Sequence, residues 1–480
     1  MAELPPAVQL HAGDPGGASR LRSAWVVAAG VLAGVLVAAS LSRPLWSDAS
    51  WPGAAGGAVT GTACVWLLLA SLRFRAITLG AFTAVVLLTA FWAKWLTASE
   101  PLKVYFIEVP FDNDLAIQVT AIFALAATLG WVGVQHLWAR RSRSQAQSGG
   151  TRRHAAWLPP TTLLVLVALV LCAVKVVVAD RYSVGVPGET PRGLDVPALK
   201  TVIFYSSTYG PLACASLLML YRGLRPWVRW GAVSLVLLGY VAAGGYVGMR
   251  AATVNAALVL GFVALAGPRS GNVRFNVRHA LGWLAVATAI ITSLTLTIMR
   301  RPAGSSSTGP VGILRFLEDR IGGLDFLSVA AAGVDQHGSS LAYVDTTAWV
   351  EFLTFTVYAY PEGTVTGVAA TLPGSAFGVG GWVGAALVGL ASGALLAIAD
   401  AKYARTTEPA ATTWYLGLLL AWVNLLLEGT LYATLLIIVS FGGVYILQLL
   451  VGRWSGSRPR SASRPGDAET TTQAVATPRR

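Results

Sequence analysis

Charged residues are scarce in this sequence. They make up 12% of its 480 residues, about half of the roughly 25% that soluble globular domains carry. Hydrophobic residues make up 55%, a larger fraction than soluble globular domains of this size usually contain. The composition excludes a soluble enzyme, a DNA-binding protein and a secreted disulfide-bonded domain. It is typical of a polytopic membrane protein.

Cysteine is also rare, and several catalytic motifs are missing. Cys64, Cys172 and Cys214 all lie within apolar segments, as small buried residues do. The sequence has no Walker A motif for ATP hydrolysis, no Cys/His or His/Glu spacing for zinc and no GxSxG elbow for a serine hydrolase. We therefore expect no ATP-driven pump, no metal site and no cofactor.

Long apolar runs predict an all-α fold with about twelve transmembrane helices. A bilayer core of about 30 Å needs about 20 apolar residues of helix. Windows of that size give spans at residues 24–41, 57–72, 76–95, 115–138, 156–178, 201–221, 230–249, 251–267, 280–299, 375–399, 412–427 and 430–451. Nine spans thus fall within 24–299 and three within 375–451. Residues 1–23 and the basic tail 452–480 lack an apolar face, and we expect both to be disordered.

The distribution of charge predicts the orientation. With both termini in the cytoplasm, most Lys and Arg residues fall on the cytoplasmic side, including the run at 140–143, and most Asp and Glu residues fall outside. This arrangement obeys the positive-inside rule, and the reverse one violates it. The sequence therefore predicts a multi-pass protein of the inner (cytoplasmic) membrane with both termini in the cytoplasm.

The longest outer loop, residues 300–374, is the candidate active-site loop. Apolar residues at 313, 314, 317, 321 and 324 recur at helical spacing. They predict an amphipathic helix over 311–327 that lies on the outer leaflet and is interrupted by a Gly-Gly pair. The loop also holds Asp325, His337 and Glu351, and it concentrates ionisable groups that the spans largely lack.

Arginines on the outer side form a second signal, because the positive-inside rule disfavours them there. They are Arg181, Arg192, Arg250, Arg300, Arg301, Arg315 and Arg320. A guanidinium offers bidentate donors that match a phosphate. We expect a functional role for Arg250 and Arg320. Arg300 and its neighbour are equally well explained as helix-end charges, and Arg315 as a local ion pair with Asp319.

Three smaller features carry predictions of their own. The D-x-D pattern at 112–114 is a weak candidate for holding a divalent cation near a sugar phosphate. The glycine pairs Gly380/Gly384 and Gly389/Gly393 predict close helix packing. Lys94 and Lys175 lie near the outer ends of their spans, and we expect their ammonium groups to reach the membrane interface.

The segment 371–384 carries a resemblance to a known family. Its core, Phe377-Gly378-Val379-Gly380-Gly381, resembles the F-G-x-x-G core of the Wzy-type oligosaccharide repeat-unit polymerases, which are O-antigen polymerase/ligase-like membrane glycosyltransferases. The turn Gly248-Met249-Arg250 is similar to the family's arginine at the outer start of a helix. The resemblance covers about residues 230–450.

The resemblance implies an inverting, metal-independent glycosyltransferase that joins glycan repeat units carried on undecaprenyl pyrophosphate. Arg250 and Arg320 would hold the pyrophosphate, with secondary contacts from the remaining outer arginines of 181–315. Asp319, Asp325, Glu351 or His337 would act as general base. The implied partners are the lipid-linked glycan, the bilayer, a flippase and a chain-length regulator, with no nucleic acid.

Two alternatives stay open. One is a glycosyltransferase that takes a single sugar from a polyprenyl phosphate, and a metal requirement would favour it. The other is a twelve-helix transporter or flippase without covalent chemistry. Against the transporter, the spans carry almost no acidic residue or arginine at mid-membrane, where such proteins keep their substrate and ion sites.

Overall fold

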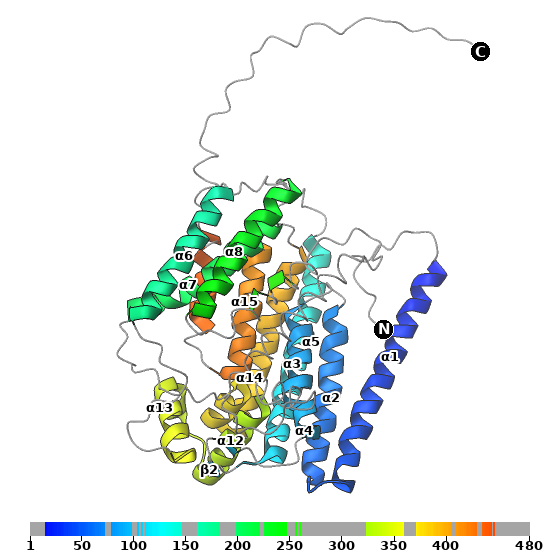
Figure 1. Cartoon of the computed structure of the whole chain (residues 1–480). Coiled ribbons are helices and arrows are strands. Elements are labelled where there is room, and N and C mark those ends of the chain that lie inside the picture. The colour runs from blue at the N-terminus through cyan, green and yellow to red at the C-terminus, as the bar shows by residue number, and fades with distance from the viewer. Residues whose placement is uncertain are drawn as a thin grey trace, which may run out of the picture.

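The computed structural model describes residues 15–72, 78–97, 103–104, 107–108, 111–145, 161–181, 198–220, 225–246, 255–256, 259–260, 323–359, 371–405, 409–429, 434–443 and 445–446. These residues form a helical bundle (Figure 1). We call its lower end in Figure 1, where α1 ends and α12 and α13 lie, the loop end.

The first helices pack around α5. Their bounds are α1 Pro15–Ser42, the 3-10 turn η1 Arg43–Leu45, α2 Trp51–Leu72, α3 Leu79–Val86, the π-helical η2 Leu87–Ala93, α4 Lys94–Thr97 and α5 Asn113–Gln145. The short strands β1 (Lys103–Val104) and β2 (Ile107–Glu108) pair antiparallel between α4 and α5. Within this group, α5 packs most extensively against α2, and α2 also contacts α1 and α3.

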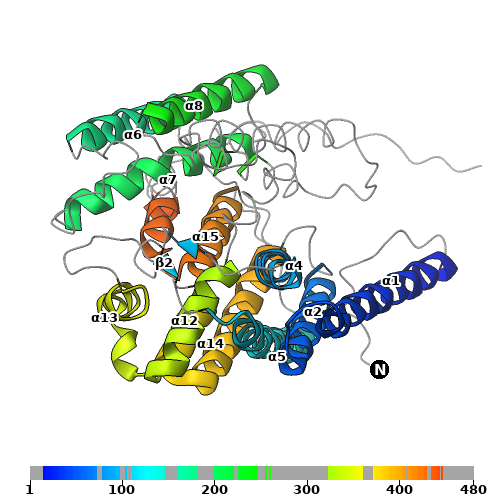
Figure 2. The ribbon, with the colours of Figure 1, turned by 60° about the horizontal axis from the view of Figure 1, so that its bottom comes forward.

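The remaining helices form a side layer and a second half of the core. The side layer consists of α6 (Thr161–Arg181), α7 (Ala198–Leu220) and α8 (Pro226–Tyr246), which lie together at one side of the bundle in Figure 2. The second half consists of α12 (Gly323–His337), η3 (Leu341–Val344), α13 (Thr346–Glu351), η4 (Phe352–Val357), α14 (Leu372–Arg405) and α15 (Pro409–Glu428). Contacts between α7 and α15 join the two.

The closest helix pair, α5 and α14, is built on glycine. A Cβ on Gly389 would lie 2.6 Å from the carbonyl oxygen of Phe123, and a Cβ on Gly393 would lie 1.9 Å from that of Ala127. Only residues without a side chain permit this approach, so the packing prediction for this glycine pair is confirmed. It is wrong for Gly380, which has no atom within 4 Å of a built Cβ and lies where α14 breaks.

A buried carboxylate joins α14 to the start of α3. Asp400 accepts hydrogen bonds from the backbone N–H groups of Leu79 (2.8 Å) and Gly80 (3.1 Å), from Trp131 Nε1 (3.1 Å) and from the Tyr415 hydroxyl. The first amides of a helix have no partner within the helix, and they attract negative charge. Asp400 therefore acts as a cap for α3 supplied by a distant part of the sequence.

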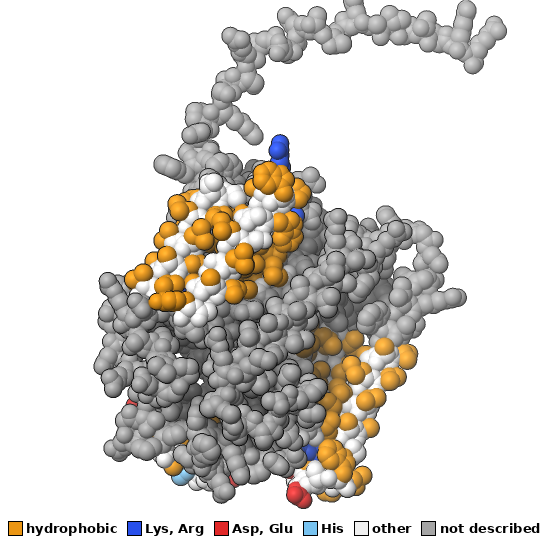
Figure 3. Space-filling view, viewed as in Figure 1, with side chains coloured by type: hydrophobic (Ala, Val, Ile, Leu, Met, Phe, Trp, Pro, Cys, Tyr) orange, Lys and Arg blue, Asp and Glu red, His pale blue; other side chains and the backbone are white. Residues whose placement is uncertain are grey.

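The structure fits the prediction of a polytopic helical membrane protein. Seven described helices are long and apolar enough to cross a bilayer, and the shorter apolar helices Thr161–Val177 and Thr434–Gly443 lie within further predicted spans. Figure 3 shows apolar side chains spread over the outward flanks of the side layer and of the α1 region. The predicted spans 251–267 and 280–299 lie outside the described residues, apart from two short helical stretches at 255–256 and 259–260.

Two expectations need correction. α1 begins at Pro15, so the prediction of disorder for residues 1–23 is wrong for 15–23; a nucleated helix extends at little cost beyond its apolar part. Residues 1–14 and the predicted tail 452–480 lie outside the described residues. Lys175 does not reach the interface: its side chain is fully buried, with Nζ 5.3 Å from the centre of the Tyr240 ring, a cation–π arrangement.

Candidate functional site at the loop end

The described part of the 300–374 loop folds at the loop end and is attached to two spans. α12 packs against α5 and α14, and Figures 1 and 2 show it beside them. The backbone N–H of Asp112 donates to the carbonyl oxygen of Ser328 over 3.3 Å, and that of Ser340 donates to the carbonyl of Gly378 over 2.9 Å. These bonds tie the loop to the starts of α5 and α14.

α12 is buried in protein instead of lying on the membrane surface. Gly323, Leu324 and Leu327 are all buried, and a Cβ on Gly323 would meet the Phe91 ring at 2.7 Å. The outer-leaflet prediction is therefore wrong for residues 323–327, and residues 311–322 lie outside the described residues. An apolar stripe at helical spacing is satisfied equally by lipid and by neighbouring helices, so spacing alone does not distinguish the two.

Asp325 is occupied by an ion pair. It lies in the first turn of α12, and its Oδ2 is 3.4 Å from Lys94 Nζ, with both side chains about 10% exposed. A carboxylate is also favoured near a helix N-terminus. The expectation that Lys94 reaches the interface is wrong, because this partner holds it inside. To act as a general base, Asp325 would first have to break its ion pair with Lys94.

His337 ends α12 and is exposed beside an aromatic cluster. Its ring lies 5.9 Å from Phe352, edge to face. Phe352 stacks on Tyr343 (4.7 Å) and on Trp349 (5.6 Å). We call Tyr343, Trp349 and Phe352 the loop aromatic cluster. Aromatic rings keep their geometry through extensive packing. The cluster therefore fixes the side of the His337 imidazole that it contacts, and the rest of the His337 side chain is exposed.

Glu351 is the second exposed candidate. It is the last residue of α13, directly before Phe352 of the loop aromatic cluster. α13 is capped by Asp345, whose Oδ1 accepts a hydrogen bond from the Thr347 N–H over 2.9 Å. The cap and the cluster fix both ends of this short helix, and the exposed Glu351 directly precedes Phe352, the residue that His337 contacts.

Most predicted arginines lie outside the described residues. These are Arg192, Arg250, Arg300, Arg301, Arg315 and Arg320, and Asp319 lies there with them. Arg181 is the last residue of α6, in the side layer and not in the described loop. The structure thus leaves His337 and Glu351 exposed, one in contact with Phe352 and the other directly before it in the sequence, and assigns Asp325 to an ion pair.

The glycine-rich core of residues 377–381 lies at a break in α14. Gly380 (φ −143°, ψ 20°) and Gly381 (φ 58°, ψ −143°) are not helical. Gly381 adopts a positive φ that side chains disfavour. A Cβ on Gly378 would lie 2.6 Å from the Trp349 ring, and one on Gly384 would lie 2.2 Å from the Ala376 carbonyl. The break therefore folds the start of α14 against the loop aromatic cluster.

A buried arginine at the loop end, Arg43, was not among the residues that the sequence singled out. Arg43 is 4% exposed, and its Cζ lies 4.2 Å from the centre of the Trp95 ring. Trp95 Nε1 donates to Asp114 Oδ1 over 3.0 Å, and the Ser50 N–H donates to the same carboxylate. The only signal in the sequence was an arginine followed by proline directly after an apolar span.

The D-x-D pattern has a structural role in place of the predicted cation site. Asp112 Oδ1 accepts from the Leu115 N–H over 2.8 Å and so caps α5, while Asp114 binds Trp95 and Ser50. Among the described residues, no group of three His, Cys, Asp or Glu side chains is arranged to hold a metal ion. The two carboxylates are used for separate backbone and indole contacts.

Comparisons of the chain with protein-family models, with curated proteins and with solved structures found no match.

Proposed function

We propose that this chain is a membrane glycosyltransferase that polymerises undecaprenyl-pyrophosphate-linked oligosaccharide repeat units on the outer face of the cytoplasmic membrane. The observation that carries the proposal is the break in α14. It brings the core shared with the repeat-unit polymerases, residues 377–381, against Trp349 and the Ser340 backbone of the 300–374 loop. The segment that resembles the family thus adjoins the loop aromatic cluster, which His337 contacts through Phe352 and which Glu351 directly precedes in the sequence.

The proposed reaction needs one base and a site for the leaving group. The hydroxyl oxygen of one repeat unit attacks the anomeric carbon of another, and its proton passes to the base. The bond from that carbon to the pyrophosphate oxygen breaks, and its electron pair leaves with undecaprenyl pyrophosphate. His337 and Glu351 are the accessible bases among the described candidates, and base catalysis of this kind contributes about 10²–10⁴-fold.

In this proposal the leaving pyrophosphate is held by outer arginines. Arg250 and Arg320 are the first candidates, because guanidinium groups bind phosphate oxygens in pairs and stay charged. The charge that develops on the leaving oxygen is then stabilised in the transition state. Twelve spans, cytoplasmic termini and an outward-facing loop end belong to the same proposal, as do a flippase and a chain-length regulator as partners.

No specific observation favours either alternative, the single-sugar transferase or the transporter. A metal-assisted single-sugar transferase would use the D-x-D pattern, whose two carboxylates have structural partners. A coupled transporter would keep a usable acid inside its spans, and Asp400, a buried acid in a described span, is bound by four donors.

A surface-polysaccharide gel tests the proposal. It compares the parent strain, a strain that lacks the gene, and that strain complemented with the wild type, Arg320→Ala or Asp48→Ala. We expect the ladder to collapse to a single repeat without the gene and with Arg320→Ala, and to return with Asp48→Ala, whose side chain is exposed. Loss of one sugar from every repeat would favour the single-sugar transferase. Unchanged chains in the deletion strain would refute both enzymes.

A further inference from the structure

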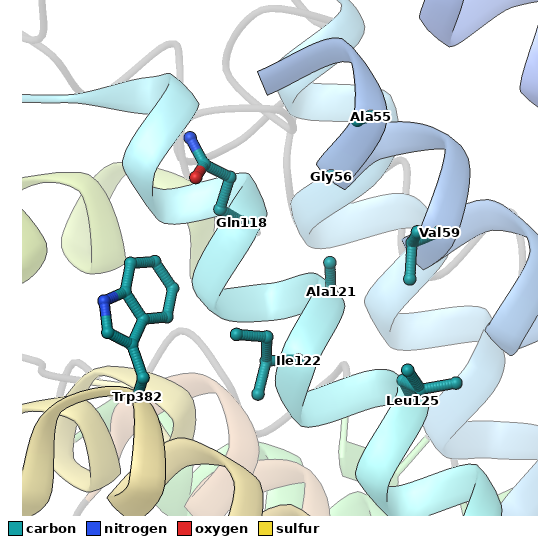
Figure 4. A pocket seen from close by; sticks show the side chains of 8 residues that line it. All are labelled: Ala55, Gly56, Val59, Gln118, Ala121, Ile122, Leu125 and Trp382. Carbon is teal, nitrogen blue, oxygen red and sulfur yellow. The ribbon is translucent and has the colours of Figure 1, made fainter. Parts of the chain in front are cut away.

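An apolar groove opens on the flank of the bundle near the loop end. Figure 4 shows its lining side chains: Ala55, Gly56 and Val59 of α2, Gln118, Ala121, Ile122 and Leu125 of α5, and Trp382 of α14. Its volume is about 470 Å³. Seven of these eight side chains are apolar or absent, and the groove lies about one to three turns from the start of α5, in the half of the bundle nearest the loop end.

The groove faces the surface that lipid covers. Val59, Leu125 and Trp382 are 40%, 46% and 41% exposed, although they belong to spans that are apolar enough to cross a bilayer. Small residues shape its floor: a Cβ on Gly56 would lie 3.1 Å from the Gln118 Cα. An open apolar recess at this depth is filled by hydrocarbon, because water and polar groups are excluded there.

One wall of the groove is connected to the candidate site. Trp382 follows the Gly380–Gly381 break directly, and its ring packs against Phe377 at 5.1 Å. The adjacent Gly378 contacts Trp349 of the loop aromatic cluster. The α14 wall of the groove therefore continues, through Phe377 and Gly378, to the loop aromatic cluster, which lies beside His337. A chain lying in the groove would have its headgroup at the loop end.

We infer that the groove holds the part of the isoprenoid chain next to the headgroup of the lipid-linked substrate, an inference that rests on the proposed function. Phospholipid acyl chains enter any such recess, but their headgroups gain nothing from this position. A lipid pyrophosphate binds through both its headgroup and its chain. Once the headgroup is bound, the chain enters the groove without a second loss of translational freedom, so the two contacts reinforce each other. The groove is thus a substrate-binding element formed by α2, α5 and α14.

Photocrosslinking tests the inference with two matched variants. Leu125 lines the groove, and Leu129 lies one turn further along the same exposed face of α5, outside it. The full chain in nanodiscs of mixed phosphatidylcholine and phosphatidylglycerol is irradiated with undecaprenyl pyrophosphate that carries a diazirine in its isoprenoid chain. We expect peptides of α2, α5 and α14 to be labelled. Leu125→Trp should reduce this labelling at least fivefold, and Leu129→Trp should leave it unchanged.

Competition distinguishes the two sources of hydrocarbon. Excess unlabelled undecaprenyl pyrophosphate should remove the labelling, and doubling the phosphatidylglycerol content should not. Labelling elsewhere, equal labelling of the two variants, or equal competition by phosphatidylglycerol would overturn the inference. Val59→Trp serves as a second groove variant if Leu125→Trp lowers the melting temperature. No turnover is needed, so failure of labelling with intact polymerisation refutes the groove alone, whereas labelling without polymerisation refutes the proposed function alone.

Discussion

At the scale of single residues, ionisable side chains inside the described bundle are held by identified partners. Asp400 is bound by two backbone amides, an indole and a phenol, and Lys94 by Asp325. Burial makes each of these groups costly unless it is paired. Their first role is therefore to fix helix positions, and each partnership predicts a measurable stability effect.

Replacing Asp400 should destabilise the bundle strongly. Asp400→Ala removes the carboxylate that accepts from the Gly80 N–H and the Trp131 indole, while the Leu79 N–H keeps its bond to the Tyr415 hydroxyl, at a cost of about 3 kcal/mol or more. Asp400→Asn should lie between Asp400→Ala and the wild type, because an amide oxygen still accepts. Thermal unfolding in detergent, followed by intrinsic fluorescence, measures the change. Asp48→Ala, on an exposed side chain, is the control, and equal melting temperatures for it and Asp400→Ala would contradict the capping role.

The Lys94–Asp325 pair should show strong coupling. Asp325→Asn or Lys94→Met alone leaves a charge of low exposure without its partner, at a cost of about 3 kcal/mol. The double variant should be more stable than either single variant. A double-mutant cycle on melting temperature measures this coupling. Additive losses would show that the two groups act independently, and loss of activity by Asp325→Asn at unchanged stability would instead favour Asp325 as the base.

At the scale of elements, the glycine seam between α5 and α14 sets the distance between the two halves of the core. Gly393→Ala should cost about 1–3 kcal/mol, because its Cβ would lie 1.9 Å from a backbone oxygen that only helix displacement can move. Gly133→Ala on α5, where a Cβ would have no atom within 4 Å, should be neutral or slightly stabilising through helix propensity. The melting temperatures of the two variants test this prediction. Equal shifts would contradict the claim that Gly393 is required for the close approach of α5 and α14.

The sequence predicts spans better than it predicts partners. Runs of about 20 apolar residues locate α2, α5 and α14 closely, because bilayer thickness dictates their length. The same patterns do not distinguish a helix on lipid from one buried in protein, so α12 was misplaced. Arg43 was missed for a similar reason: its partners, Trp95 and Asp114, are distant in sequence and are found only in the folded chain.

At the scale of the whole molecule, the loop end should face outward. The native cysteines are buried, at 1%, 6% and 0% exposure, so we expect them not to react with a thiol-labelling reagent in the folded protein. Ser339 at the loop end and Arg225 before α8 are both exposed, and the charge distribution assigns them to opposite sides. A membrane-impermeant maleimide applied to intact cells should label Ser339→Cys and spare Arg225→Cys until the cells are lysed. Labelling of Arg225→Cys alone would invert the topology.

The central claim is that this chain joins lipid-linked repeat units, and reconstitution tests it most directly. The purified full chain is placed in proteoliposomes with repeat units on undecaprenyl pyrophosphate, extracted from the strain that lacks the gene. Neither nucleotide nor divalent metal is added, and EDTA is present. We predict a ladder of longer lipid-linked glycans, with one undecaprenyl pyrophosphate released for each bond formed. His337→Ala and Glu351→Ala should identify the base, since one of them should lose the ladder at an unchanged melting temperature. Repeat units that stay single with the wild-type chain would contradict the account.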